Sequence, residues 1–89
     1  MLYFNLRGVT YHELEFYDDA IYDFGLALKN NPFFSEALRN RALSHYLIGD
    51  ISSAFDDLEQ ALEINPNDSI AFNRLQLLKN QSFSITDAA

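Results

Sequence analysis

The sequence contains no cysteine and no tryptophan, and it has only two prolines and three glycines. Without cysteine the chain has no disulfide framework, no zinc–thiolate site and no thiol nucleophile. No apolar run approaches the roughly 18 residues that a membrane-spanning helix needs, and the basic and apolar segments of a secretion signal are missing from the N-terminus. We therefore expect a soluble, cytoplasmic protein.

Basic residues are also scarce, because six Lys and Arg stand against thirteen Asp and Glu, for a formal charge of −7. A chain of this charge is repelled by nucleic acids and by anionic membrane surfaces, which argues against both as partners. Apolar side chains, by contrast, are abundant: 48% of the residues are hydrophobic, with eight Phe and five Tyr. This composition favours a folded chain over a disordered one.

One stretch of the sequence occurs twice. Ala20–Pro32, AIYDFGLALKNNP, returns thirty-four residues later as Ala54–Pro66, AFDDLEQALEINP, with Ala, Asp, Ala, Leu, Asn and Pro in register. A period of roughly 20 to 50 residues is typical of stacked-repeat proteins. In both stretches the apolar residues recur at helical spacing, and proline ends each helix because it has no amide hydrogen to donate.

The periodicity predicts an all-α chain of five helices, at about residues 1–15, 18–30, 36–48, 52–64 and 69–80. The candidate N-caps of the last three helices are Ser35, Asp50 or Ser52, and Asp68 or Ser69. The expected buried residues of the second and fourth helices are Ala20, Phe24, Ala27, Leu28, Ala54, Leu58, Ala61 and Leu62, and the apolar residues of the fifth helix are Ala71, Phe72, Leu75 and Leu78. Residues 82–89 form a short tail that we expect to be frayed.

Two helices and thirty-four residues per unit, with a proline at the end of each unit, resemble the tetratricopeptide repeat. In the first unit the pattern reads Phe4, Gly8, Tyr11, Ala20, Phe24, Ala27 and Pro32, and in the second Leu38, Ala42, His45, Gly49, Ala54, Leu58, Ala61 and Pro66. The resemblance implies a solenoid of helical hairpins. Its units would be a first repeat at 1–34, a second repeat at 35–68 and a C-terminal capping helix or half unit at 69–81, followed by the tail at 82–89.

Arg7 and Arg41 stand where the tetratricopeptide pattern usually has leucine. Each is followed sixteen residues later by an aspartate, Asp23 after Arg7 and Asp57 after Arg41. Because the pairing occurs twice, we interpret it as a structural Arg–carboxylate ion pair between the two helices of one unit, or between neighbouring units. Partly buried charges are normally paired, so a ligand-binding role for these arginines is the less favoured alternative.

The resemblance further implies that the first helix of each unit lines a concave inner surface. The family's inner-surface positions correspond here to Asn5, Val9, His12, Arg39, Asn40, Leu43, Tyr46, Asn73, Arg74 and Leu77. Asn amides can hold a peptide backbone, and Arg can bind a carboxylate through two hydrogen bonds. A peptide or a partner helix with an acidic group would therefore suit this surface. The alternative is a solvated inner face, the default for exposed polar residues.

Some members of the family bind the terminal carboxylate of chaperone tails through two Lys, two Asn and one Arg. The matching positions here hold Asn5, Val9, Asn40, Ile70 and Arg74, so only Asn40 and Arg74 agree. With both lysines absent, most charge-assisted donors are missing. We expect no such carboxylate clamp.

No other pattern in the sequence predicts catalysis or a cofactor. His12 and His45 have no second metal ligand at helical spacing, and neighbouring acids such as Asp18 and Asp19 are typical of a solvated helix face. Phe33 and Phe34 follow Pro32, and we expect one of them to be exposed. The sequence thus predicts a non-enzymatic protein-interaction module, a scaffold or adaptor. The alternative is a structural element that forms homodimers through its end helices.

Overall fold

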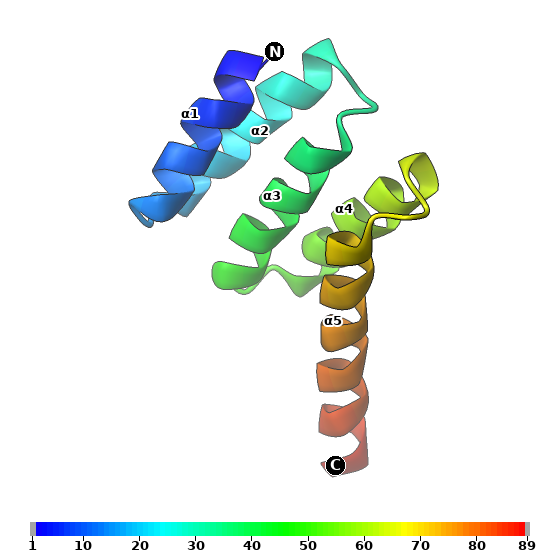
Figure 1. Cartoon of the computed structure of the whole chain (residues 1–89). Coiled ribbons are helices and arrows are strands. Elements are labelled where there is room, and N and C mark those ends of the chain that lie inside the picture. The colour runs from blue at the N-terminus through cyan, green and yellow to red at the C-terminus, as the bar shows by residue number, and fades with distance from the viewer. Residues whose placement is uncertain (1, 89) are drawn as a thin grey trace.

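The structure is a computed structural model that describes residues 2–88, with side chains described for residues 2–80. In this part of the chain all regular structure is helical, and the elements are α1 (Leu2–Glu13), α2 (Tyr17–Asn30), α3 (Ser35–Leu47), α4 (Ile51–Ile64) and α5 (Ser69–Ala88). Figure 1 shows two helical hairpins, α1–α2 and α3–α4, stacked side by side, with α5 following the second hairpin. The predicted fold class, an all-α chain of helical hairpins with five helices, is confirmed.

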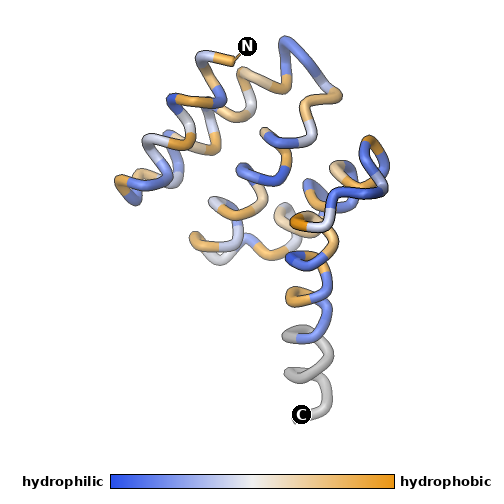
Figure 2. The backbone as a smooth tube through the Cα atoms, viewed as in Figure 1, coloured by the Kyte–Doolittle hydropathy of each residue, from blue (hydrophilic) through white to orange (hydrophobic). Residues whose placement is uncertain are grey.

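The turns between helices follow the sequence signals closely, with one exception. Asp50 caps α4, since its carboxylate accepts a hydrogen bond from the Ser53 amide at 3.2 Å. Asp68 caps α5 in the same way through the Ala71 amide at 3.1 Å, at the end of a hydrophilic turn (Figure 2). Ser35 is not a cap, and this prediction was wrong: the Leu38 amide donates to the carbonyl of Phe34, so α3 already includes Ser35.

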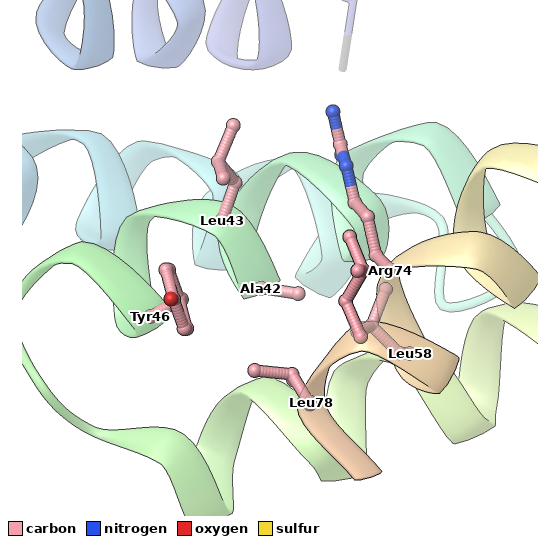
Figure 3. A pocket seen from close by; sticks show the side chains of 7 residues that line it. Ala42, Leu43, Tyr46, Leu58, Arg74 and Leu78 are labelled. Carbon is pink, nitrogen blue, oxygen red and sulfur yellow. The ribbon is translucent and has the colours of Figure 1, made fainter. Parts of the chain in front are cut away.

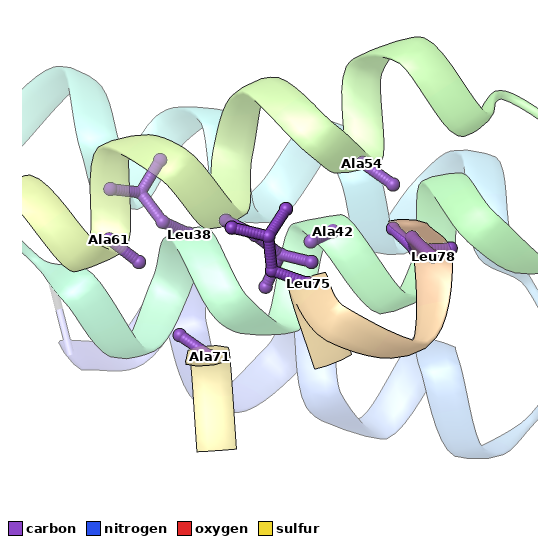
Figure 4. Packing of buried hydrophobic residues seen from close by; sticks show 8 residues of the cluster. Leu38, Ala42, Ala54, Ala61, Ala71, Leu75 and Leu78 are labelled. Carbon is purple, nitrogen blue, oxygen red and sulfur yellow. The ribbon is translucent and has the colours of Figure 1, made fainter. Parts of the chain in front are cut away.

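The main core lies between α3, α4 and α5 (Figure 4). Its buried residues are Leu38, Ala42, Ala54, Leu58, Ala61, Ala71, Leu75 and Leu78. Half of them are alanines, and small side chains let helix backbones approach closely. In the first hairpin the equivalent buried residues of α2 are Ala20, Phe24 and Ala27. These burials agree with the predicted stripes, and Leu28 and Leu62 are packed against the same core while partly exposed.

Phe72, one of the apolar residues predicted in the fifth helix, is 51% exposed. Its counterpart thirty-four residues earlier, Leu38, is 1% exposed and belongs to the core with residues of α4, the second helix of its own hairpin. In the described part of the chain no helix follows α5, so nothing covers Phe72. Phe33 is the exposed member of the Phe33–Phe34 pair, at 72%.

Helix α5 continues to Ala88, beyond the end near Asn80 that the sequence predicts. The frayed tail predicted at residues 82–89 lies outside the residues whose side chains are described. Within the described residues, none of the helices combines the length and the hydropathy needed to cross a membrane.

Candidate binding face of α1, α3 and α5

Helices α1, α3 and α5 lie on one side of the molecule, with α2 and α4 behind them (Figure 1). We call the surface that they form the three-helix face. It corresponds to the inner surface predicted from the sequence. The positions of its side chains depend on three sets of contacts: ion pairs within each hairpin, polar contacts between α1 and α3, and a cluster where α3 meets α5.

The first set consists of two ion pairs that join the helices of each hairpin. Arg7 Nε lies 2.6 Å from Asp23 Oδ2, and its Nη2 donates to Oδ1 at 2.9 Å. Arg41 and Asp57 make the same bidentate contact, at 2.8 and 2.7 Å. Both carboxylates are buried, with Asp23 at 1% and Asp57 at 3% exposure. The hydrogen bond from Arg7 to Asp23 raises the pKa of Arg7 above its usual value, so its charge is permanent.

The second set joins α1 to α3. Asn40 Nδ2 donates to Asn5 Oδ1 at 3.3 Å, and His12 Nδ1 is hydrogen-bonded to Ser44 Oγ at 2.8 Å. Asn5 and Ser44 are fully buried, at 1% and 0% exposure. Burial, followed by the positive charge of Arg74, lowers the pKa of His12. Buried polar groups of this kind need partners, so these side chains hold the two hairpins together.

The third set lies where α3 meets the start of α5. Arg39 Nε is 2.8 Å from Asp68 Oδ2, and their side chains are 19% and 7% exposed. Asp68 therefore serves twice, as the cap of α5 and as the counterion of Arg39. Arg74 donates from Nη1 to the carbonyl of Arg39 at 3.5 Å. Burial, and then repulsion by Arg39, lowers the pKa of Arg74.

An apolar cavity of about 230 Å³ opens beside Arg74 (Figure 3). Its lining comes from three helices: Ala42, Leu43 and Tyr46 of α3, Leu58 of α4, and Arg74, Leu77 and Leu78 of α5. Arg74 supplies the charged group of this lining. Leu77 is 61% exposed, so a large part of its side chain is accessible to a bound molecule.

The predicted inner-surface residues separate into three groups in the structure. Leu43, Tyr46, Arg74 and Leu77 meet around the cavity. Asn5, His12, Asn40 and Arg39 make the contacts between helices described above. Val9 is half-buried on α1, and Asn73 is exposed on α5. Leu77 and Asn73 are the most exposed residues of this set.

Three residues that line the cavity, Ala42, Leu58 and Leu78, were not among the predicted site residues. The sequence predicts Leu58 and Leu78 as apolar residues of their helices and Ala42 as part of the repeat pattern, and all three are buried core residues that also line the cavity. The sequence predicts Asp68 only as a candidate cap of the fifth helix, and its contact with Arg39 was not predicted. Within the described residues no group of three or more His, Cys, Asp or Glu could hold a metal ion.

Residues 35–68 match the family model of the tetratricopeptide repeat. Among solved structures, the chain is similar to the first TPR of Spaghetti (RPAP3) bound to the HSP90 peptide SRMEEVD, with 26% identity and a TM-score of 0.84 over 91% of this chain. It is also similar to a structure showing molecular features of the UNC-45 chaperone critical for binding and folding muscle myosin, with 26% identity and a TM-score of 0.80 over 96% of this chain. This chain spans 64% of the first structure and 10% of the second. No curated protein matches it in sequence.

Proposed function

The chain contains a tetratricopeptide repeat at residues 35–68 and has the fold of solved tetratricopeptide-repeat structures, and from this premise we propose that it binds a peptide or a partner helix on its three-helix face. It acts as a scaffold or adaptor and without catalysis. The observation that carries the proposal is the cavity beside Arg74. Protein-binding sites typically combine an apolar pocket with a few polar groups that orient the ligand.

The similar Spaghetti structure holds a peptide, which supports a peptide as the ligand class. A clamp for a terminal carboxylate is still not expected here. Of the positions that would form it, Asn5 is 1% exposed and accepts a hydrogen bond from Asn40, while Ile70 has no charge. Arg74 remains as the one guanidinium beside the cavity. A peptide ending in Glu-Glu-Val-Asp should therefore bind no better than its C-terminally amidated form.

The location of the site is tested by placing negative charge on two faces in turn. Asn73→Glu with Leu77→Glu changes exposed residues of the three-helix face, whereas Tyr22→Glu with Gln60→Glu changes exposed residues of α2 and α4. The first variant should abolish binding of a peptide that was selected from a random library for binding to the wild-type protein, because the new charges repel an acidic ligand. Isothermal titration calorimetry measures the binding. The second should bind like the wild type. Loss of binding in the second variant alone would refute the proposed location.

Self-association through an end helix is a second candidate, because α1 exposes a group of apolar side chains: Leu2, Tyr3 and Leu6, each between 57% and 61% exposed. Large exposed apolar patches mark interaction surfaces. Sedimentation equilibrium over a wide concentration range tests this candidate. A dimer that Leu6→Asp converts to a monomer would support it, and a monomer at every concentration would exclude it.

A further inference from the structure

Arg74 has an incompletely compensated positive charge. It is half-buried, and its described hydrogen bond, to the carbonyl of Arg39, is at the outer limit of length, 3.5 Å. Among the described residues no carboxylate lies within 4.0 Å of its guanidinium, and Asp68 is paired with Arg39 instead. The charge of Asp68 favours the charged form of Arg74 but is shared with Arg39, and a partly buried cation that is incompletely compensated is costly. An anion at this point would therefore be bound with a charge-assisted hydrogen bond and little competition from the protein.

The cavity next to Arg74 has the size of one large apolar side chain. A dry cavity of about 150 Å³ accommodates benzene, whereas sites for drug-sized molecules measure roughly 300 to 1,000 Å³. At about 230 Å³, with walls formed by Leu43, Leu58 and Leu78 among others, it lies between these sizes. A side chain that entered it would also cover Leu77, which is exposed.

We propose that the three-helix face binds an internal segment of a partner protein that places one Leu-, Met- or Phe-sized side chain in the cavity and a neighbouring Asp or Glu side chain on Arg74. The inference rests on the proposed function, and it adds the ligand's chemistry. The carboxylate comes from a side chain because two positions that would hold a chain terminus in the family's clamp cannot do so here: Asn5 is 1% exposed and bonded to Asn40, and position 70 is isoleucine. We call these two side chains of the ligand its anchors. Both are needed, because a ligand without the apolar side chain leaves the cavity exposed to water, and a ligand without the carboxylate leaves Arg74 exposed to water.

The probe for the test is a library of random eight-residue peptides, acetylated and amidated so that neither end is charged. Selection against the wild-type protein should enrich peptides with a large apolar residue within a few positions of Asp or Glu. Chemical-shift changes of backbone amides should then map the selected peptides to the cavity residues of α3 and α5. In the best peptide, replacing Asp by Asn, or the apolar residue by Ala, should each weaken binding by about tenfold.

Variants of the protein separate the two anchors. Arg74→Gln should bind the Asp and Asn forms of the peptide within about twofold of each other, while still preferring the apolar residue over Ala. Arg74→Lys should restore part of the preference for Asp. Lys79→Gln, an exposed cation on the same helix, is the matched control and should leave the tenfold preference unchanged. Circular dichroism checks that each variant is folded.

The outcomes distinguish this inference from the proposed function. If selected peptides bind the three-helix face but the Asp and Asn forms bind the wild type equally well, the ligand chemistry is wrong and the proposed function stands. If they bind only α2 and α4, or if no peptide binds at all, both are wrong. An unchanged preference for Asp in Arg74→Gln assigns the carboxylate to another residue and overturns the inference.

Discussion

Gly8 and Phe24 are in contact so close that a Cβ atom on Gly8 would lie 2.6 Å from Cε1 of Phe24. Phe24 is fully buried, at 0% exposure. Thirty-four residues later the same two positions hold Ala42 and Leu58, each 1% exposed. The larger ring in the first hairpin is thus accommodated by the loss of a methyl group on the facing helix. The two repeats conserve the combined volume of the pair while changing both members.

Gly8→Ala should therefore lower the free energy of unfolding by about 1 to 3 kcal/mol, the usual cost of overpacking a core, although alanine favours a helix by roughly 1 kcal/mol over glycine. Urea denaturation measures the change. Adding Phe24→Leu reproduces the pair found in the second repeat, and the double variant should be more stable than Gly8→Ala alone. A Gly8→Ala protein that gains stability would show that the ring can move aside.

The turn after α1 has a glutamate, Glu15, at the position where the turn after α3 has a glycine, Gly49. Glu15 has φ 66° and Gly49 has φ 87°, both in the left-handed region. Only glycine adopts this region without steric cost, which is about 1 to 2 kcal/mol for other residues. A Cβ on Gly49 would meet no atom within 4 Å, so packing does not contribute to a substitution there.

Glu15→Gly should accordingly raise the free energy of unfolding by about 0.5 to 1 kcal/mol. The substitution relieves the backbone strain, and the greater freedom of glycine in the unfolded chain offsets part of that gain. Gly49→Ala should lower it by about 1 kcal/mol. Thermal unfolding followed by circular dichroism measures both. If both variants changed stability in the same direction, backbone strain would not be the cause.

Arg41→Leu should strongly destabilise the second hairpin, because it leaves the carboxylate of Asp57, 3% exposed, without its bidentate partner. Breaking a buried ion pair by removing one member costs about 3 to 5 kcal/mol. Replacing both residues by leucine should recover most of the loss, since a well-packed apolar pair is often as stable as the ion pair. Peptide binding by the double variant should match the wild type, because neither residue lines the cavity. A loss of binding at unchanged stability would give Arg41 a role in the ligand site.

Contacts within one hairpin could be predicted from the sequence, and contacts between successive hairpins could not. The sixteen-residue spacing of arginine and aspartate recurs with the thirty-four-residue period, so the sequence alone indicates the pairs Arg7–Asp23 and Arg41–Asp57. The Arg39–Asp68 pair spans twenty-nine residues and occurs once. Its formation depends on the rotation of α5 against α3, which no periodicity encodes. The cavity and the incomplete charge compensation of Arg74 depend on that same rotation.

We expect His12 to make the stability of the protein depend on pH. It is hydrogen-bonded to Ser44 on α3, and its ring packs edge-on against Tyr17 on α2, with ring centroids 5.3 Å apart. Its pKa is lowered first by burial and then by the charge of Arg74, while Glu13 opposes the shift. The folded state thus favours the neutral imidazole. As the pH falls, the unfolded chain binds a proton near pH 6.5, before the folded chain does.

The sign of the effect follows from this difference in proton binding. Stability conferred by neutral His12 is complete above about pH 6.5 and is lost as the pH falls below that value towards the lowered pKa. The melting temperature should therefore fall between pH 7.5 and pH 5 in the wild type, and fall less in His12→Gln. Arg74→Gln should also reduce the dependence, because it removes the second cause of the shift. An identical pH profile in wild type and His12→Gln would show that the α1–α3 contact tolerates the charged imidazole, and would exclude His12 as the source of any acid sensitivity.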